Sequence, residues 1–257
     1  MTQAAELVVT DEDGVRWITL HRPESRNGLT IEINERIIAA LDGASDAPAV
    51  RAVAIYGAGG AFSSGLDLKT AVALASVDTA ELEARMRRTF HGLIRSIVGC
   101  VKPVVAVVDG PAAGFGCDLA LACDLRLCSD RARFGEVFVR RGLMPDGGGT
   151  FMLPRIVGLG RALELMFTGE LVGAEEAYRL GLANRVVPTA DLMGVASTFM
   201  ARLAAGPPLV MRTVKQAVYA GLTGTLDEAL ERELAGQLRL LKSRDFQEGV
   251  AAFLEKR

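Results

Sequence analysis

Histidine, cysteine and aromatic residues are scarce in this sequence. The 257 residues include two histidines, one tryptophan and four cysteines without a Cys-x-x-Cys pair, and aromatic side chains make up 5% of the chain. Two histidines leave a zinc site with few candidate ligands, and so few aromatic rings make a poor surface for stacking nucleic-acid bases. We therefore expect no metal site, no nucleic-acid partner, and cysteines that are buried free thiols.

Excess charge and long apolar runs are absent as well. The formal net charge of -2 provides no electrostatic basis for binding nucleic acid or an anionic membrane. No uninterrupted apolar run reaches the roughly 18 residues of a membrane span, and the N-terminus has no basic segment followed by an apolar run. The sequence therefore predicts a cytoplasmic protein without a membrane partner.

Small aliphatic residues dominate the chain and form several strand-like runs. Half of the residues are hydrophobic, a composition usual for α/β enzymes. Apolar, β-branched runs predict buried strands at residues 51–56, 103–108 and 125–128, and glycines follow the first two. Residues 7–20 predict a β-hairpin that turns at Asp11–Gly14.

Helical periodicity occupies the intervals between these strands and the last third of the chain. Thr30 can cap a helix whose apolar residues recur every four positions, and residues 79–98 predict another helix. From Gly158 onward the pattern is mostly helical. Strand, glycine loop and helix in repetition predict an α/β fold, with its active site built from loops at one end of the strands.

Two glycine-bearing loops carry the first chemical signal. Ala61–Leu68 and Pro111–Asp118 each follow a predicted strand and precede a helical segment. The first N–H groups of a helix are unpaired and carry partial positive charge, so two such loops can together hold negative charge that develops on a carbonyl oxygen. Each loop alone has a simpler explanation, because glycines also permit tight turns.

Both loops belong to a set of five segments that resembles the crotonase (enoyl-CoA hydratase/isomerase) superfamily. The segments follow the order and about the spacing of that family, and the resemblance extends over nearly the whole chain. Phe138 and the closing segment from Phe246 to Lys256 resemble the enoyl-CoA isomerases of the phenylacetate pathway in particular. The five segments are Ala61–Lys69, Lys102–Gly110, Ala113–Asp124, Arg133–Gly135 and Gly142–Thr150.

The resemblance implies a spiral of β-β-α repeats that acts on an acyl-CoA thioester. Residues 1–195 would form the catalytic core, and residues 196–257 a helical region that assembles the chain into a homotrimer or a dimer of trimers. The family requires no cofactor beyond the coenzyme A moiety of the substrate. The resemblance also places the oxyanion donors at the N–H groups of Leu66 and Phe115, with Gly65, Gly114 and Gly116 in the substrate pocket.

The acids that divide this family by reaction are only partly present. In the family's typical hydratases two glutamates straddle a water molecule, and the matching positions here hold Asp118 and Phe138. Asp118 is one methylene group shorter, and it has an alternative interpretation, since a carboxylate near a helix N-terminus is stabilised without any catalytic role. Glu136, two residues before Phe138, is interpreted as a solvated or salt-bridged residue.

Asp146 stands where several non-hydratase members of the family carry a catalytic aspartate, among them ring-opening isomerases of phenylacetate degradation and an aryl-CoA dehalogenase. A turn residue between proline and glycine is the simpler alternative. With Asp146 as the base, we expect the chain to shift the double bond of an enoyl-CoA, while Phe115 and Phe138 keep water from the dienolate. The alternatives are a hydratase that uses Asp118, with or without Asp146, and an idle acyl-CoA-binding protein.

Several basic residues complete the set of candidates. Arg22 and Arg26 are candidates for contacting coenzyme A phosphates, and Lys256 is a candidate to approach from a neighbouring subunit. A solvated basic face explains these three residues nearly as well. His91 lies in a helical stretch and is interpreted as a surface or packing residue.

Overall fold

The computed structural model describes residues 5–255, which form an α/β protein around a six-stranded sheet. The strand order is β1-β2-β3-β4-β6-β9, and every neighbouring pair is parallel except the hairpin of β1 and β2. The predicted α/β class is therefore confirmed. The strands are β1 (Leu7–Glu12), β2 (Val15–Leu20), β3 (Ala52–Gly57), β4 (Val104–Val108), β6 (Leu125–Ser129) and β9 (Arg185–Val187).

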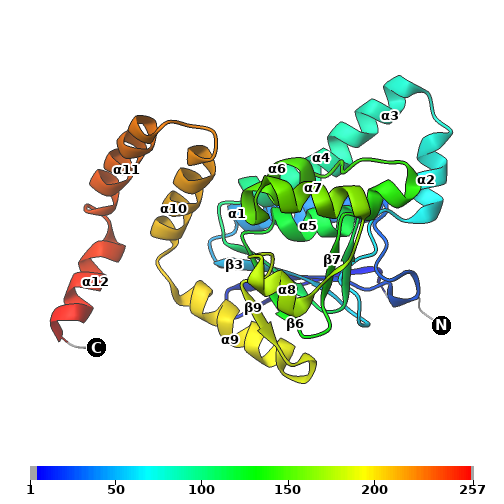
Figure 1. The fold of residues 1–257 in the computed structure, drawn as a ribbon. Helices are drawn as coiled ribbons and strands as arrows, with labels where there is room; N and C mark the ends of the chain where they lie inside the picture. Colours follow the sequence, from blue (N-terminus) through cyan, green and yellow to red (C-terminus); the bar gives the residue numbers. More distant parts are fainter. Residues whose placement is uncertain (1–4, 256–257) are drawn as a thin grey trace.

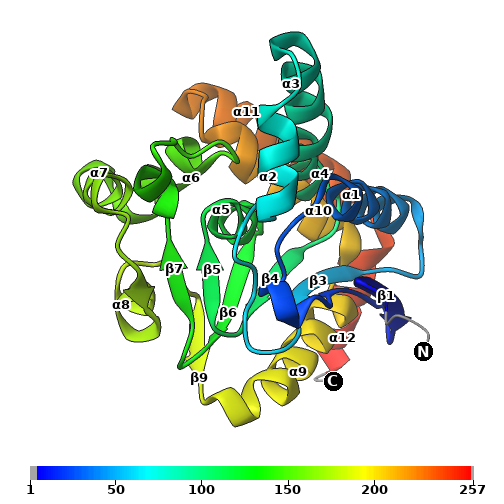
Figure 2. The same ribbon diagram turned by 90° about the vertical axis from the view of Figure 1, so that its right-hand side faces the viewer.

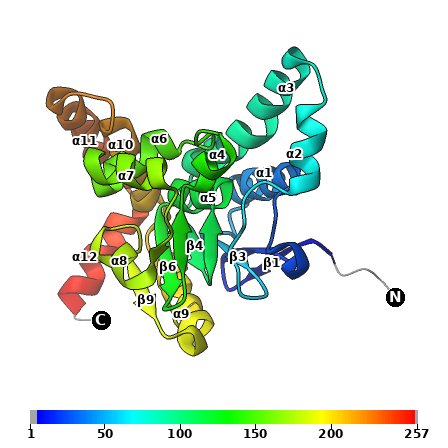
Figure 3. The same cartoon turned by 45° about the vertical axis from the view of Figure 1, so that its right-hand side comes forward.

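Helices cover both faces of the large sheet (Figure 3). Successive side chains of a strand point to opposite faces, so Val105 and Val107 of β4 pack against α9, whereas Val104 and Val108 join the core under α1, α4 and α5. Burial on both faces is the usual state of a parallel sheet. The four helices are α1 (Ile31–Asp46), α4 (His91–Gly99), α5 (Phe115–Ala122) and α9 (Leu192–Ala205).

Two local predictions near the N-terminus are confirmed. The hairpin turns at Asp13 and Gly14, whose φ values of 49° and 78° suit the two-residue turn that matches strand twist. Helix α1 begins after Thr30, whose side-chain oxygen accepts a hydrogen bond from the N–H of Ile33 at 3.2 Å. Both features depend on neighbouring residues in the sequence.

A second, three-stranded sheet accounts for the spiral arrangement. Its strands are ordered β5-β7-β8, and β5 and β7 directly follow β4 and β6 of the large sheet. Figure 2 looks onto these strands, with α5 continuing from β5. The strands are only two or three residues long, so no periodicity in the sequence revealed them. They are β5 (Pro111–Ala113), β7 (Arg133–Gly135) and β8 (Val172–Gly173).

The helix predicted over residues 79–98 is confirmed, and one of its turns is irregular. Helix α3 (Thr79–Arg85) leads into a π-helical turn, Met86–Phe90, before α4 begins at His91. Thr89 and Phe90 are buried within this turn. A π-helical turn contains one extra residue, and such turns occur frequently at functional sites.

The last third of the chain is largely helical, as predicted. Figure 1 shows α11 and α12 standing apart from the α/β body, whereas α10 contacts it through an ion pair between Lys215 and Asp124 at 2.8 Å. The predicted division after residue 195 falls within α9 and stays a prediction.

The described cysteines are all buried and unpaired. Within residues 5–255 no helix is both long and apolar enough to cross a membrane. The remaining helices are α2 (Leu68–Ala75), α6 (Gly149–Val157), α7 (Leu159–Thr168), α8 (Ala174–Arg179), α10 (Pro208–Gly221), α11 (Leu226–Leu240) and α12 (Arg244–Glu255).

Candidate active site

The two glycine-bearing loops lie side by side at one end of the small sheet. Ser63 forms a parallel bridge with Ala112 of β5, and the N–H of Ala113 donates to the Ser63 carbonyl at 2.9 Å. Gly65 has a φ of +88°, and a β-carbon built on it lies 2.7 Å from the Ala113 carbonyl oxygen and 3.1 Å from the Phe115 nitrogen. A side chain at Gly65 would therefore force the loops apart and cover the Phe115 amide.

The predicted oxyanion donors, the N–H groups of Leu66 and Phe115, form no backbone hydrogen bond within the described part of the chain. The Leu29 N–H donates to the Gly65 carbonyl, and the Leu29 carbonyl accepts from the Asp67 N–H. The Leu66 N–H therefore points away from Leu29. Phe115 is the first residue of α5, where a helical N–H lacks a carbonyl one turn earlier. Both residues line one pocket. Their role as oxyanion donors stays a prediction.

A pocket of about 360 Å³ lies beside these amides, and three phenylalanine rings line it. Phe115 packs edge-on against Phe90 with their ring centroids 5.1 Å apart, and Phe138 is buried in the 3₁₀ turn after β7. Gly114 lines the pocket, whereas Gly116 packs behind it against Ser63. The other lining residues are Ser25, Gly28, Ser64, Leu66, Asp67, Leu68, Ala71, Val137, Arg141, Leu143 and Asp146.

Asp146 lines this pocket from the turn that precedes α6. Its Oδ1 is buried and has no hydrogen-bond partner among the described residues. Burial raises the pKa of the Asp146 carboxyl above its usual range, while the charge of the nearby His91 and the backbone of Asp146 itself act to lower that pKa. A partly buried carboxylate with a free oxygen at a pocket wall is suited to accept a proton from a bound molecule.

Asp118 lies behind the pocket wall. Its side chain is fully buried on α5, it is not among the residues that line the pocket, and its Oδ2 accepts a hydrogen bond from the Gly147 N–H at 2.9 Å. Burial raises the pKa of Asp118, and the Gly147 hydrogen bond acts in the opposite direction. Asp118 thus contacts the loop that carries Asp146, whereas its own catalytic role stays a prediction.

The interpretation of Glu136 as a solvated or salt-bridged residue is wrong. The residue is 2% exposed, and neither of its carboxyl oxygens has a hydrogen-bond partner in the part of the chain that the structure describes. Burial, and then the nearby charge of Asp118, raises the pKa of Glu136 well above its usual range. The structure therefore places three carboxyl groups, those of Asp118, Glu136 and Asp146, close together around the start of α6.

His91 lies against the other side of the Asp146 loop. A second pocket of about 350 Å³ is lined by His91, Arg95 and Asp146 together with residues 147–148. His91 is half-buried beside this loop, as its interpretation as a surface or packing residue allows, and its charge acts to lower the pKa of Asp146. The π-helical turn ends immediately before His91 and so directs Phe90 to the first pocket and His91 to the second.

Replacement of His91 by glutamine is expected to raise the pKa of Asp146 and, with Asp146 as the predicted base, to move the acid limb of the kcat/KM profile to higher pH. A protonated His91 favours the carboxylate form of Asp146, so without this charge Asp146 gains its proton at a higher pH and the base form is lost sooner on acidification. The measurement is a pH–rate profile of both proteins. His21→Gln, at the chain's other histidine, provides the control, and an unmoved acid limb in His91→Gln would contradict the coupling.

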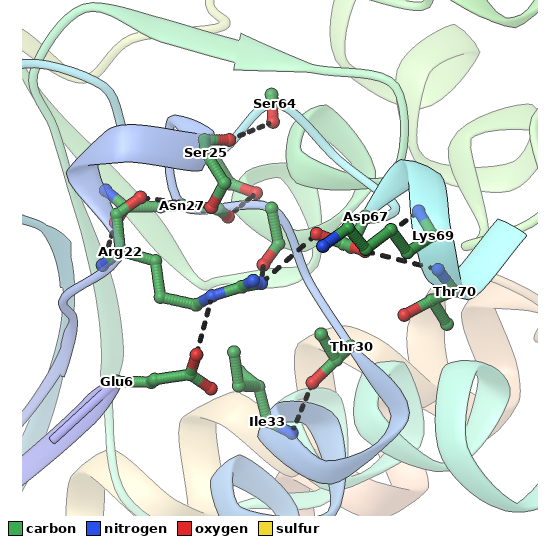
Figure 4. Close-up of polar contacts among 12 residues, drawn as sticks. Glu6, Arg22, Ser25, Asn27, Thr30, Ile33, Ser64, Asp67, Lys69 and Thr70 are labelled. Atoms are coloured by element: carbon green, nitrogen blue, oxygen red, sulfur yellow. Dashed lines mark hydrogen bonds and ion pairs between the residues drawn. The ribbon is translucent and has the colours of Figure 1, made fainter. Parts of the chain in front are cut away.

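Side-chain contacts of Arg22 hold the first glycine-bearing loop in place (Figure 4). Its guanidinium donates to the Gly28 carbonyl at 2.7 Å and forms ion pairs with Glu6 at 3.1 Å and Asp67 at 3.4 Å. Asp67 in turn caps α2 by accepting from the N–H groups of Lys69 and Thr70. The Arg22 guanidinium, a predicted contact for coenzyme A phosphates, is thus engaged by two carboxylates and a carbonyl.

Arg22→Met is expected to lower the free energy of unfolding by about 2–3 kcal/mol, because the largely buried Asp67 and the Gly28 carbonyl lose a charged donor. Urea unfolding of both proteins measures this change. Arg26→Met serves as the matched control, since Arg26 is exposed beside the same turn. An Arg22→Met protein as stable as the parent would show that these contacts do not hold the loop.

Two predicted contacts of coenzyme A remain, Arg26 and Lys256. Arg26 is exposed and adopts a left-handed backbone conformation, with a φ of 52°. Lys256 lies outside the described residues. Within residues 5–255, no group of three or more histidine, cysteine, aspartate or glutamate side chains is arranged to hold a metal ion.

Comparisons with known proteins agree with this architecture. A family model described as enoyl-CoA hydratase/isomerase matches residues 10–257. The chain is 42% identical to a probable enoyl-CoA hydratase of Rhodobacter capsulatus, over 95% of this chain and 93% of that protein. It is 35% identical to the 1,2-epoxyphenylacetyl-CoA isomerase of Escherichia coli, over 96% and 94% of the two chains. The crystal structure of an enoyl-CoA hydratase from Polaromonas sp. JS666 superposes with a TM-score of 0.93 at 35% identity, covering 98% of this chain and 97% of that one. The predicted crotonase-like spiral is confirmed by this likeness.

Proposed function

The chain belongs to the enoyl-CoA hydratase/isomerase family of acyl-CoA enzymes, and we propose that within it this protein shifts a double bond of an enoyl-CoA thioester. The observation that supports the proposal is the pocket wall, where two unpaired amides lie near one carboxyl group with a free oxygen, that of Asp146. The other carboxylate in the described lining, Asp67, already caps α2 and pairs with Arg22.

The proposed reaction needs one base and two donors. Asp146 removes a proton from C2 of a 3-enoyl thioester, and the electron pair of the broken C–H bond moves into a dienolate whose charge develops on the thioester oxygen. The N–H groups of Leu66 and Phe115 hold that oxygen. Asp146 then returns the same proton to C4, which leaves the double bond between C2 and C3 and restores the Asp146 carboxylate.

The lining of the pocket favours this reaction over addition of water. Phe90, Phe115 and Phe138 present apolar surface where hydration would require an ordered water molecule. Asp118 stands at the position of a hydratase glutamate but is one methylene group shorter. It accepts a hydrogen bond from the Gly147 N–H behind the pocket wall. One carboxylate at the pocket wall is sufficient to move one proton between two carbons.

A hydratase is the second candidate, and the relative from Rhodobacter capsulatus, a probable enoyl-CoA hydratase that is 42% identical, favours it. Hydration of a 2-enoyl thioester needs a group that deprotonates water and a proton for C2. Asp146 would have to perform both steps, or Asp118 would have to leave the Gly147 amide and enter the pocket.

Separate assays with 3-enoyl-CoA and 2-enoyl-CoA test the proposal. We expect rapid migration of the double bond in the 3-enoyl substrate and slow or absent hydration of the 2-enoyl substrate. Rapid hydration without migration would replace the isomerase by the hydratase. Binding of acyl-CoA with neither reaction, and with no exchange of the C2 hydrogen for solvent deuterium, would identify an idle binding protein.

We also propose that the chain assembles as a homotrimer or a dimer of trimers. Four leucines of α11 at intervals of four residues are each more than half exposed, and a second chain would cover such an apolar row. The size of the particle in solution, measured by light scattering, tests this proposal. The leucines are Leu226, Leu230, Leu234 and Leu238.

A further inference from the structure

Glu136 is a buried acid for which the proposed reaction has no direct use. The residue lies behind the pocket wall, 2% exposed, and both carboxyl oxygens lack hydrogen-bond partners within residues 5–255. An ionised carboxylate without a partner is costly to bury, so Glu136 requires either a donor or a proton of its own. Its surroundings decide between these two possibilities.

The titratable groups that face Glu136 supply no positive charge. Asp118 and the Cys117 thiol approach from α5, Asp146 from the turn before α6, and Glu170 from the segment after α7. A thiol is only a weak donor, and that of Cys117 lies beside Glu136 without forming a hydrogen bond of acceptable geometry. The adjoining cavity of about 10 Å³ has scarcely the room of one water molecule.

Gly149 permits Glu136 and Asp118 to approach each other. A β-carbon built on Gly149 would overlap Oδ1 of Asp118 and lie 3.0 Å from Oε1 of Glu136, so both oxygens occupy the space that a side chain there would fill. Oδ2 of Asp118 already accepts from the Gly147 N–H, whereas its Oδ1 has no partner among the described residues. A protonated Glu136 would bring a donor to the side of Gly149 on which that free oxygen lies.

We propose that Glu136 is a positioning residue: in its protonated form it donates a hydrogen bond to Oδ1 of Asp118, and Asp118 through its bond to Gly147 holds Asp146 in place. This role of Glu136 rests on the proposed function, because it requires Asp146 to be the base. The Gly147 N–H donates to Asp118 and favours its charged form, whereas neither oxygen of Glu136 has a donor among the described residues. The proton of the pair therefore resides on Glu136.

Two substitutions of similar length separate this role from simple packing. Glu136→Gln keeps an N–H donor for Asp118, and we expect its kcat to stay near that of the parent. Glu136→Met fills the same space without a donor, and we expect kcat to fall by roughly 10²-fold with little change in KM, as expected when a reacting group is displaced by about 1 Å. Urea unfolding of both variants shows whether each is folded.

The pH profile provides a readout that packing alone would not change. The contribution of Glu136 is present while it is protonated and is lost as the pH rises through its raised pKa, so kcat of the parent should decline on the alkaline side. Glu136→Gln cannot ionise and should lack this decline. An alkaline limb that persists unchanged in Glu136→Gln, or equal kcat values for the Gln and Met variants, would overturn the proposal.

Hydrogen exchange at the Gly147 amide tests the positioning role without any substrate. We expect this amide to be protected in the parent and in Glu136→Gln, and to exchange at least tenfold faster in Glu136→Met. Equal protection in all three proteins would overturn the role of Glu136 even if Asp146 is the base. Conversely, full turnover of Asp146→Asn combined with this exchange pattern would refute the proposed function and leave the contact between Glu136 and Asp118 established.

Discussion

Asp146→Asn is expected to lower turnover of enoyl-CoA by a factor of about 10²–10⁴ while leaving acyl-CoA binding nearly unchanged. Asparagine has the shape of aspartate but does not accept a proton at neutral pH, so the pocket and the two amides remain while C2 keeps its hydrogen. Steady-state kinetics measure the loss, and calorimetric titration with a non-reactive acyl-CoA measures binding.

Asp67→Asn is the matched control for this substitution, because Asp67 is the other aspartate that lines the pocket. Its Oδ1 accepts the capping hydrogen bonds of α2, and an asparagine oxygen accepts them equally well. We expect the Asp67→Asn protein to be less stable, because Arg22 loses one of its two carboxylate partners, but to retain most of its activity. If Asp146→Asn is as active as this control, Asp146 has no part in the reaction.

Gly65→Ala is expected to lower kcat/KM by about 10²–10³, the usual effect of losing one oxyanion donor. The added β-carbon would approach the Phe115 nitrogen to 3.1 Å and the Ala113 carbonyl oxygen to 2.7 Å, so the Phe115 N–H is covered or displaced. A substitution of Phe115 itself would leave its backbone N–H in place, whereas Gly65→Ala disturbs that donor directly. The rate with enoyl-CoA and the affinity for acyl-CoA are the quantities to measure.

Strain at a positive φ needs a control of its own. Gly158 has a φ of +80°, close to the +88° of Gly65, yet a β-carbon built on Gly158 meets nothing within 4 Å. Gly158→Ala therefore also places a side chain at a positive φ but without the collision, and we expect it to lose stability but keep its activity. Equal losses of activity in both variants would assign the effect to strain rather than to the donor.

Features that depend on short stretches of chain were predictable from the sequence. The turn at Asp13–Gly14 and the cap at Thr30 each involve residues within four positions of one another, and their side-chain chemistry favours one local geometry. The two glycine-bearing loops were recognisable for the same reason, since each follows an apolar strand. Their side-by-side arrangement required pairing between Ser63 and Ala112, which are distant in the sequence.

The environment of Glu136 was not predictable from local pattern. A glutamate three residues after an arginine has the appearance of a surface residue, and its burial results from α5 and α6 packing over the end of β7. The contact between His91 and the Asp146 loop likewise depends on a π-helical turn, which has no signal of its own in hydrophobic periodicity. The residues around a site are therefore harder to predict than the loops that form it.

The π-helical turn Met86–Phe90 has a consequence for how the size of the pocket beside the two amides can change. A helix that has gained one residue can lose it again, and a deletion there would restore continuous α-helical winding. Because Leu93 and Ile97 anchor α4 in the core, the shift of about 100° and 1.5 Å per residue would fall on α3 and its connection to α2. An insertion or deletion at this point would thus reshape the outer rim of the pocket beside Leu68 and Ala71 while Leu66, Phe115 and Asp146 stay in place.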